Sequence, residues 1–205
     1  MSFFQRLITD PILALAFLLS VVLAVTVHEF SHAYVADRLG DPTPGSQGRI
    51  SLSPLAHLDP LGSLAFLLIG FGWGKPVMYD PSYFRNRFSE LWVALAGPAS
   101  NVALAILLNI LLTFLPGSNS TTLIIGIIIK INVTLAAFNL LPFPPLDGSS
   151  IIAAFWPEYR SPRYAQIGSI ALLAILFLAP PLLGTILSPV IQFITFLSTL
   201  FGLLH

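Results

Sequence analysis

The sequence predicts an all-α membrane protein that crosses the bilayer several times. Its 205 residues are 56% hydrophobic and 9% charged, with a mean hydropathy of +0.87, whereas a soluble domain carries about 25% charged residues. Nine Lys and Arg balance nine Asp and Glu, so the absence of net charge argues against a nucleic-acid partner and leaves the lipid bilayer as the expected surroundings. We expect one transmembrane domain over residues 1–205, with a core over about 11–150 and C-terminal helices over about 165–205.

Three apolar segments are long enough to cross a hydrocarbon core of about 30 Å as helices, which takes about 20 residues. They are Pro11–Val35, Leu91–Leu115 and Leu123–Leu141. After them, two prolines at 180–181 divide the remaining apolar stretch, because proline interrupts a helix. We therefore predict a C-terminal pair of helices over Ile167–Ala179 and Leu182–Leu204.

The segment Leu61–Phe71 is also apolar, but at about eleven residues it is too short to cross the membrane as a helix. If it turns back, seven of the nine basic residues share one side of the membrane, and the positive-inside rule makes that side cytoplasmic. These seven are Arg38, Arg49, Lys75, Arg85, Arg87, Arg160 and Arg163. Shortly before it, Arg49–Ser53 alternates like a short strand. We predict a re-entrant hairpin with a short β segment, shielded from lipid by protein.

The pentapeptide His28-Glu29-Phe30-Ser31-His32 lies near the end of the first apolar segment. On a helix, His28 and His32 point about 40° apart and can grip one zinc ion. Glu29 lies beside them, placed to take a proton from a water activated by the zinc. The chain has no cysteine, so a zinc ion must be held by histidine and carboxylate. A chance match is the alternative, but ionisable residues at membrane depth are costly and usually functional.

A catalytic zinc needs a third protein ligand, and the sequence offers more than one candidate. Asp147 follows the Leu123–Leu141 helix, which in the hairpin topology returns to the side where the first helix ends. Asp147 therefore reaches the level of the histidines, although a plain turn is the other interpretation of Asp147-Gly148. His57 is chemically able to bind zinc, and a role in polarising the substrate fits it equally well. Other carboxylates suit the site less. Asp37 faces away from the two histidines on the helix, and Asp41 and Asp59 stand in turn-like contexts, where aspartate is common.

Three motifs together resemble those of the site-2 protease family of intramembrane zinc metalloproteases. They are His28–His32, Ala96-Gly97-Pro98-Ala99-Ser100-Asn101 in a middle span, and the stretch from Asn139 to Gly148. The resemblance implies that His28, His32 and Asp147 hold one Zn²⁺ per chain. It also implies that Glu29 is the general base and that three helices carrying the motifs form the catalytic core. The chain looks like the compact bacterial subgroup, which has no inserted peptide-binding module and no C-terminal nucleotide-sensing domain.

This resemblance implies an endopeptidase that cleaves transmembrane segments of membrane proteins. We expect it in the plasma membrane of a prokaryote, with its active site toward the cytoplasmic side. Asn139, His57 and Asn101 are candidate oxyanion or substrate-positioning groups, and interhelical hydrogen bonding is the alternative for Asn101. An unwound substrate could pair with extended backbone near Arg49–Ser53 or Pro142–Leu146. Two other classes are a catalytically silent relative that binds membrane segments and a metal transporter. The sequence indicates no oligomeric state.

Overall fold

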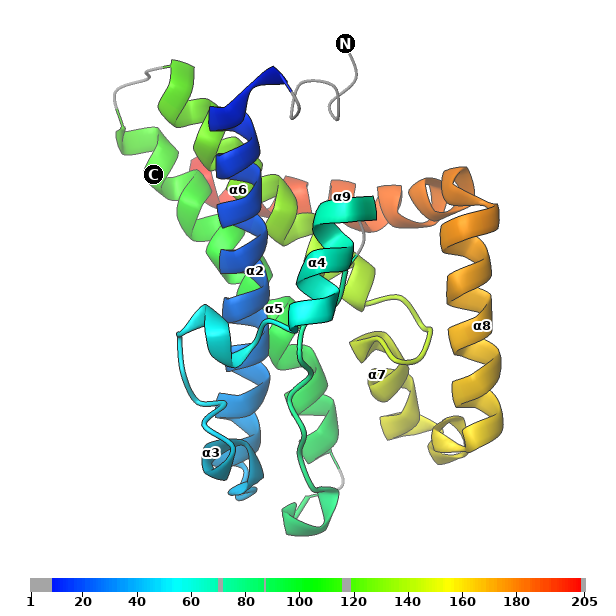
Figure 1. Ribbon diagram of the computed structural model, residues 1–205. Helices are drawn as coiled ribbons and strands as arrows, with labels where there is room; N and C mark the ends of the chain where they lie inside the picture. Colours follow the sequence, from blue (N-terminus) through cyan, green and yellow to red (C-terminus); the bar gives the residue numbers. More distant parts are fainter. Residues whose placement is uncertain (1–8, 70–71, 87, 116–118, 204–205) are drawn as a thin grey trace.

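The computed structural model describes residues 9–69, 72–86, 88–115 and 119–203, and these residues are mostly helical (Figure 1). The long helices are α2 (Pro11–Arg38), α5 (Ser89–Phe114), α6 (Asn119–Asn139), α8 (Pro162–Leu178) and α9 (Pro180–Leu203). Shorter helices connect them: α3 (Thr43–Ser46), α4 (Pro60–Ile69), α7 (Asp147–Phe155) and the 3-10 turns η1 (Pro54–Ala56), η2 (Pro81–Tyr83) and η3 (Pro157–Arg160).

Among the residues that the structure describes, four helices are long and apolar enough to cross a membrane: Pro11–Arg38, Ser89–Phe114, Ser120–Asn139 and Pro180–Leu197. The predicted all-α, multi-span architecture is therefore confirmed, and α8 is a shorter apolar helix beside them. The first helix begins where predicted because Asp10 caps it. Its Oδ1 accepts hydrogen bonds from the backbone N–H groups of Ile12 and Leu13, at 3.0 and 3.1 Å, and Pro11 occupies the first turn.

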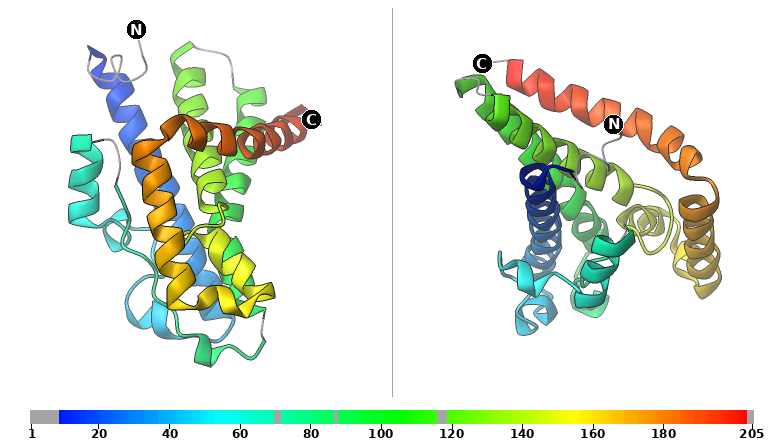
Figure 2. Two further views of the ribbon diagram at one scale, coloured as in Figure 1. Left: turned by 90° about the vertical axis from the view of Figure 1, so that its right-hand side faces the viewer. Right: turned by 45° about the horizontal axis from the view of Figure 1, so that its top comes forward.

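Helices α2, α5 and α6 pack against one another, and α5 also contacts α7 and α9. Figure 2 shows α9 crossing over α5 and α6 at a steep angle. The contacts are made by small residues, since Ala24 and Ala33 of α2, Ala105 of α5 and Ala136 of α6 are completely buried. Helices in lipid associate through such close packing, because burial of apolar surface gains nothing against lipid tails.

The predicted hairpin is present as the helix α4 followed by an extended return segment. The backbone N–H of Lys75 donates to the carbonyl of His57 at 2.8 Å, and Leu58 and Gly74 form an isolated antiparallel bridge. A side chain at Gly62 would lie 2.1 Å from the carbonyl oxygen of Trp73, so α4 and the return segment are in close contact. The two ends therefore lie side by side, and the chain turns back. Residues 70–71 lie outside the described residues.

The prediction of a short strand at Arg49–Ser53 was wrong. No strand occurs in the described part of the chain, and the Leu58–Gly74 bridge is the nearest approach to one. The polar groups of this segment form hydrogen bonds within its own loop and to the return segment of the hairpin, and none of these bonds belongs to a strand. The buried guanidinium of Arg49 donates to the carbonyls of Ala56 and Lys75, and the carbonyl of Ser51 accepts from His57 Nε2. These bonds close the loop against the base of the hairpin.

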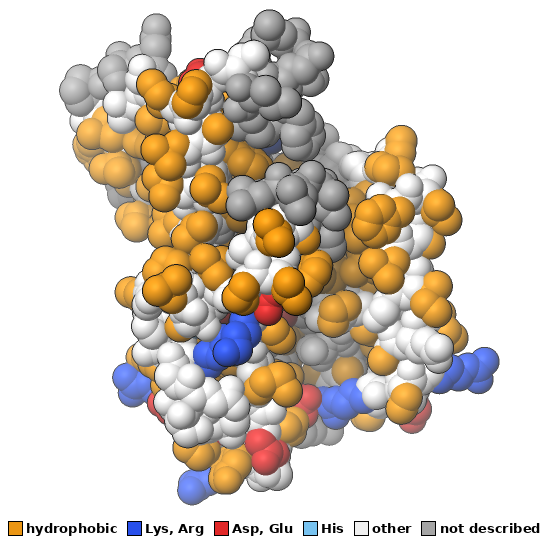
Figure 3. Space-filling model, in the orientation of Figure 1, with side chains coloured by type: hydrophobic (Ala, Val, Ile, Leu, Met, Phe, Trp, Pro, Cys, Tyr) orange, Lys and Arg blue, Asp and Glu red, His pale blue; other side chains and the backbone are white. Residues whose placement is uncertain are grey.

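Basic side chains gather at one end of the molecule. Figure 3 shows Lys and Arg mainly in the lower part of this face, where α2 ends and α5 and α8 begin, while the upper part is apolar. Of the seven residues predicted to share a side, Arg87 lies outside the described residues. Arg49 is buried against the hairpin as described above. The distribution agrees with a membrane-embedded upper region and a polar lower end.

Candidate metal centre

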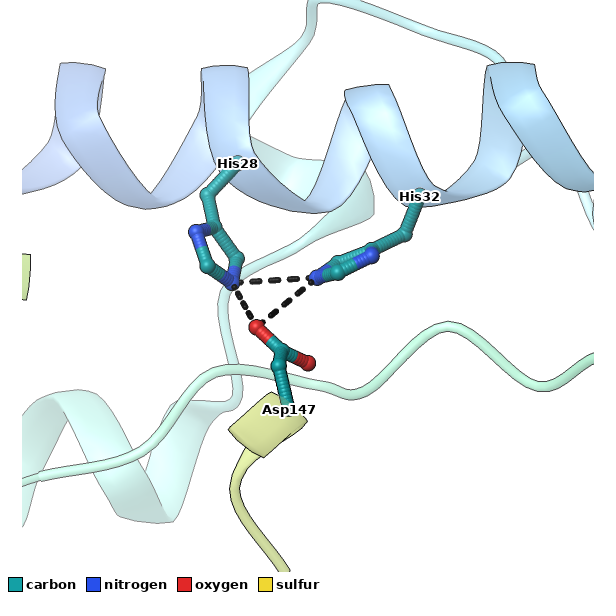
Figure 4. Close-up of side chains that lie close together, drawn as sticks. All are labelled: His28, His32 and Asp147. Carbon is teal, nitrogen blue, oxygen red and sulfur yellow. Dashed lines mark hydrogen bonds and ion pairs between the residues drawn. The ribbon is translucent and has the colours of Figure 1, made fainter. Parts of the chain in front are cut away.

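Three side chains from two distant parts of the chain converge on one point (Figure 4). His28 and His32 come from consecutive turns of α2, and Asp147 is the first residue of α7. Asp147 Oδ2 lies 3.1 Å from His28 Nε2 and 3.3 Å from His32 Nε2, and the two Nε2 atoms are 3.1 Å apart. Within the described residues, this is the only group of three or more His, Asp or Glu side chains that could hold a metal ion.

The triangle of donor atoms fits a zinc ion. Zinc binds histidine nitrogen and carboxylate oxygen at about 2.0–2.2 Å in a tetrahedron, which separates neighbouring donors by about 3.3 Å. The observed separations of 3.1 to 3.3 Å match this value. Moreover, Asp147 Oδ2 is buried and has no hydrogen-bond partner among the described residues, so a cation is the partner that its position requires.

Each histidine is oriented by a hydrogen bond at the ring nitrogen that faces away from Asp147. His28 Nδ1 lies 2.7 Å from Oδ1 of Asn101, and His32 Nδ1 lies 2.7 Å from the carbonyl oxygen of Val93. Both rings are buried, with 4% and 7% exposure. Because an acceptor at Nδ1 places the proton there, the lone pair of each Nε2 is directed toward the other two donors.

The backbone of α5 passes directly over the two rings at Gly97. A Cβ atom at this position would lie 2.3 Å from His32 Nε2 and 2.7 Å from His28 Nε2. A side chain cannot fit there without moving the histidines. Gly97 therefore allows the close packing of α5 on α2, and this packing occurs at the metal centre itself.

Asp147 is positioned by the loop that follows α6 and by elements that pack on this loop. The carbonyl of Pro142 accepts from the hydroxyl of Tyr159 in η3, and the carbonyl of Pro144 accepts from Ser169 Oγ in α8 at 3.0 Å. Burial opposes the charge of Asp147, but the two imidazoles beside its carboxylate lower the pKa of Asp147 to about 2. Two loop carbonyls already have donors, and pairing of this loop with an extended substrate stays a prediction.

Glu29 lies next to the return segment of the hairpin. It is half-buried, and its Oε2 accepts a hydrogen bond from the backbone N–H of Val77 at 3.2 Å. A Cβ atom at Gly74 would lie 3.9 Å from Glu29 Oε1. The hairpin therefore forms one wall beside the carboxylate.

The other predicted residues have different surroundings. Asn139 donates to the carbonyl of Leu135 in its own helix at 3.0 Å. His57 is completely buried and donates from Nε2 to the carbonyl of Ser51 at 2.7 Å; its Nδ1 has no hydrogen-bond partner in the residues the structure describes. The structure brings neither side chain into the group of three donors.

Tyr79, in the return segment, was missed by the sequence reasoning. Burial and the negative charges of Glu90 and Asp147 raise the pKa of its phenol, so this hydroxyl keeps its proton. A single tyrosine in a polar connection belongs to no motif, and only the fold of the hairpin brings it toward α7. No sequence signal would have identified it.

An apolar cavity of about 620 Å³ lies between α2, the hairpin and α6. Its lining comes mainly from Phe17 to Val25 of α2, from Leu58 and Trp73 of the hairpin, and from Ile131 to Phe138 of α6. The cavity reaches Val25 and Gly74, which adjoin Glu29. It therefore connects the membrane-embedded part of the bundle with the edge of the metal centre.

Comparison with known proteins identifies relatives of this chain. The model of Peptidase family M50 matches residues 118–179, which contain Asp147 but not the histidines. "Putative zinc metalloprotease YwhC" of Bacillus subtilis is 34% identical over 192 residues, covering 88% of each chain. "Putative zinc metalloprotease Rip2" of Mycobacterium tuberculosis is 31% identical over 175 residues, covering 80% of this chain and 66% of the relative. No solved structure matches significantly. The chain thus belongs to peptidase family M50, the site-2 protease family, and is a multi-pass membrane zinc metalloprotease.

Proposed function

We propose that this zinc metalloprotease cleaves transmembrane segments of membrane proteins within the bilayer. The observation that carries the proposal is the apolar cavity of about 620 Å³ that ends beside Glu29. The apolar lining of this cavity suits a hydrophobic segment of a substrate, whereas a polar, soluble peptide would gain little by binding there. The position of His28 along α2 also supports cleavage within the bilayer. At a rise of 1.5 Å per residue, His28 lies about 26 Å from Pro11, which is inside a hydrocarbon core about 30 Å thick if α2 enters the core near Pro11.

In this proposal, His28, His32 and Asp147 are the zinc ligands. When bound, the zinc supplies an activated water and stabilises the negative charge that develops on the substrate carbonyl. The triangle of donors, the outer hydrogen bonds of both imidazoles and the absence of a side chain at Gly97 all support these roles.

Glu29 acts as the general base and then as the general acid. Its carboxylate takes a proton from the attacking water, the hydroxide oxygen bonds to the carbonyl carbon, and the C–N bond breaks. The same proton passes to the leaving nitrogen, so no further reactant is needed. The backbone N–H of Val77 donates to the carboxylate and holds it beside the return segment.

The test is co-expression with a panel of single-span membrane proteins that carry a different tag at each end. The wild-type enzyme should release two tagged fragments from at least one of them, and mass spectrometry should place the cut inside the apolar segment. The Glu29→Gln variant should release neither fragment. Cleavage confined to soluble regions of the same proteins would contradict the proposal.

We also propose that the metal centre faces the cytoplasmic side of the plasma membrane of a prokaryote. The basic residues at the lower end support this orientation through the positive-inside rule. The chain has no cysteine, so single cysteines can be introduced without further changes. The variants Ser46→Cys and Ser82→Cys each place one cysteine at an exposed position, one before and one after the hairpin. Both cysteines should react with a thiol reagent that enters the cytoplasm, and neither should react with a reagent that stays outside the cell. Labelling from opposite sides, or from outside only, would contradict the orientation.

A further inference from the structure

Two buried asparagines extend the environment of His28 across three helices. Asn101 in α5 and Asn132 in α6 are both 0% exposed. Asn101 contacts His28 and the carbonyl of Ala24 in α2, and it also contacts the side chain of Asn132. A buried amide in an apolar bundle is costly unless its donors and its acceptor are all hydrogen-bonded. Each N–H of these two amides must therefore face an acceptor, and this requirement shows which way each bond runs.

The direction of this chain of bonds is fixed by backbone carbonyls, which can only accept. Asn132 Nδ2 donates to the carbonyl of Ile128 at 2.8 Å, so Asn132 Oδ1 faces Asn101. Asn101 Nδ2 then donates to Asn132 Oδ1 at 2.8 Å and to the carbonyl of Ala24 at 3.0 Å. The remaining amide atom, Asn101 Oδ1, faces His28 Nδ1 at 2.7 Å and must accept its proton.

We propose that Asn101, supported by Asn132, is a positioning residue that fixes the tautomer and orientation of His28 before the metal binds. The proton is held on Nδ1, and the lone pair of Nε2 is directed at the position shared with His32 and Asp147. The inference rests on the proposed role of His28 as a ligand. It assigns Asn101 to the outer side of the imidazole, away from the reacting atoms, and gives Asn132 a function that no motif suggested.

The two histidines are held by different means. His32 bonds to a backbone carbonyl of α5, which no side-chain substitution removes, whereas His28 depends on a side chain. His28 can therefore be loosened selectively. The partner groups beyond a metal-binding histidine typically contribute about 10- to 100-fold in metal affinity. An asparagine that only joined helices would change stability without changing the tautomer of His28.

The first measurement is zinc affinity in purified protein. Asn101→Leu should bind zinc about 10- to 100-fold more weakly. Asn101→Asp, which still offers an oxygen to His28 Nδ1, should recover most of this loss. Asn109→Leu is the matched control, because Asn109 is two turns further along α5 and donates to Ala105 of its own helix; its zinc affinity should equal that of the wild type. Unchanged affinity in Asn101→Leu would overturn the proposal.

The second measurement reads the tautomer directly in zinc-free protein labelled with ¹⁵N-histidine, at alkaline pH, with His28 assigned by comparison with His28→Gln. The His28 proton should be on Nδ1 in the wild type and in Asn101→Asp, and should shift toward Nε2 in Asn101→Leu. If Asn101→Leu does not fold, Asn132→Leu should show the same shift more weakly, because Asn101 keeps its bond to Ala24.

A wild-type proton on Nε2, or a tautomer that none of these variants changes, would overturn the proposal. Because the tautomer is read without zinc, this failure would leave the ligand assignment standing. Full zinc binding by His28→Ala would instead contradict the proposed function.

Discussion

The metal centre is held from two sides that are built differently. On the histidine side, a single helix presents His28 and His32 one turn apart, and each ring is fixed by a hydrogen bond at Nδ1. On the aspartate side, Asp147 follows a loop whose carbonyls are held by η3 and α8. A local motif thus sets one side, and contacts between distant segments set the other.

This difference leads to different tolerances. The histidine side is in direct contact with the backbone of α5 at Gly97, so even one added methyl group meets the ring atoms. The aspartate side is held through contacts one step removed from the carboxylate, and a loop can move slightly to relieve strain. We therefore expect small substitutions to have larger effects on the histidine side.

The largest effect on cleavage is expected from Glu29→Gln. Glu29 belongs to the histidine side because it lies on α2 next to His28. The amide has the same shape but cannot accept a proton, so cleavage should fall about a hundredfold or more while zinc content is unchanged. Cleavage of a single-span substrate and zinc content are measured in the same preparation. Asp37→Asn, an exposed carboxylate on the same helix, is the matched control. Near-normal cleavage by Glu29→Gln would remove Glu29 from the mechanism.

Gly97→Ala tests how tightly the histidine side is packed. The new Cβ would lie 2.3 Å from His32 Nε2, so the ring must move, and zinc affinity should fall about tenfold or more. Gly126→Ala in α6 is the control, since no described atom lies within 4 Å of its added Cβ. Equal zinc affinity in the two variants would show that α5 does not constrain the histidines.

Gly168→Ala is the corresponding test of the aspartate side. Its Cβ would lie 2.5 Å from Cδ of Pro144, so the loop before Asp147 must shift. Zinc affinity should fall, but by less than in Gly97→Ala, because the added atom does not reach the donor atoms. Gly184→Ala in α9, with no described atom within 4 Å, should have no effect. A greater loss in Gly168→Ala than in Gly97→Ala would reverse the comparison.

The smallest effect is expected from Ser169→Ala. This change removes the hydrogen bond to the carbonyl of Pro144 and should lower the free energy of unfolding by about 0.5–1.5 kcal/mol, with one zinc still bound. Thermal unfolding in detergent measures the change. Ser188→Ala is the control, because Ser188 is half-buried and its hydroxyl donates to the carbonyl of Thr185 within α9. A loss of zinc in Ser169→Ala would mean that this single bond holds the aspartate side in place.

The sequence predicted much of the histidine side and the membrane architecture. Helical spacing alone placed His28 and His32 on one face, and segment lengths identified the spanning helices. It also predicted that Asp147 reaches the same level, because chain topology and basic residues indicated that Leu61–Phe71 turns back. These predictions depend on local spacing and on segment length, which a sequence displays directly.

The remaining contacts depend on how helices cross, which spacing does not reveal. The contact of Gly97 with both rings requires the relative position of α2 and α5, and the bond from Ser169 to Pro144 joins residues 25 positions apart. Asn132 acts on His28 only through Asn101. The expected strand at Arg49–Ser53 failed for the same reason, because alternation does not specify whether a partner strand lies alongside.

The central claim is that His28, His32 and Asp147 hold one zinc ion, and zinc content per chain tests it most directly. Purified wild-type protein should contain about one zinc per chain, as a three-ligand catalytic site requires. Asp147→Asn should retain less than about a tenth of that, because it removes the charged ligand. His57→Gln should retain all of it, since the structure places His57 outside the group of donors. Full zinc content in Asp147→Asn, or its loss in His57→Gln, would contradict the account.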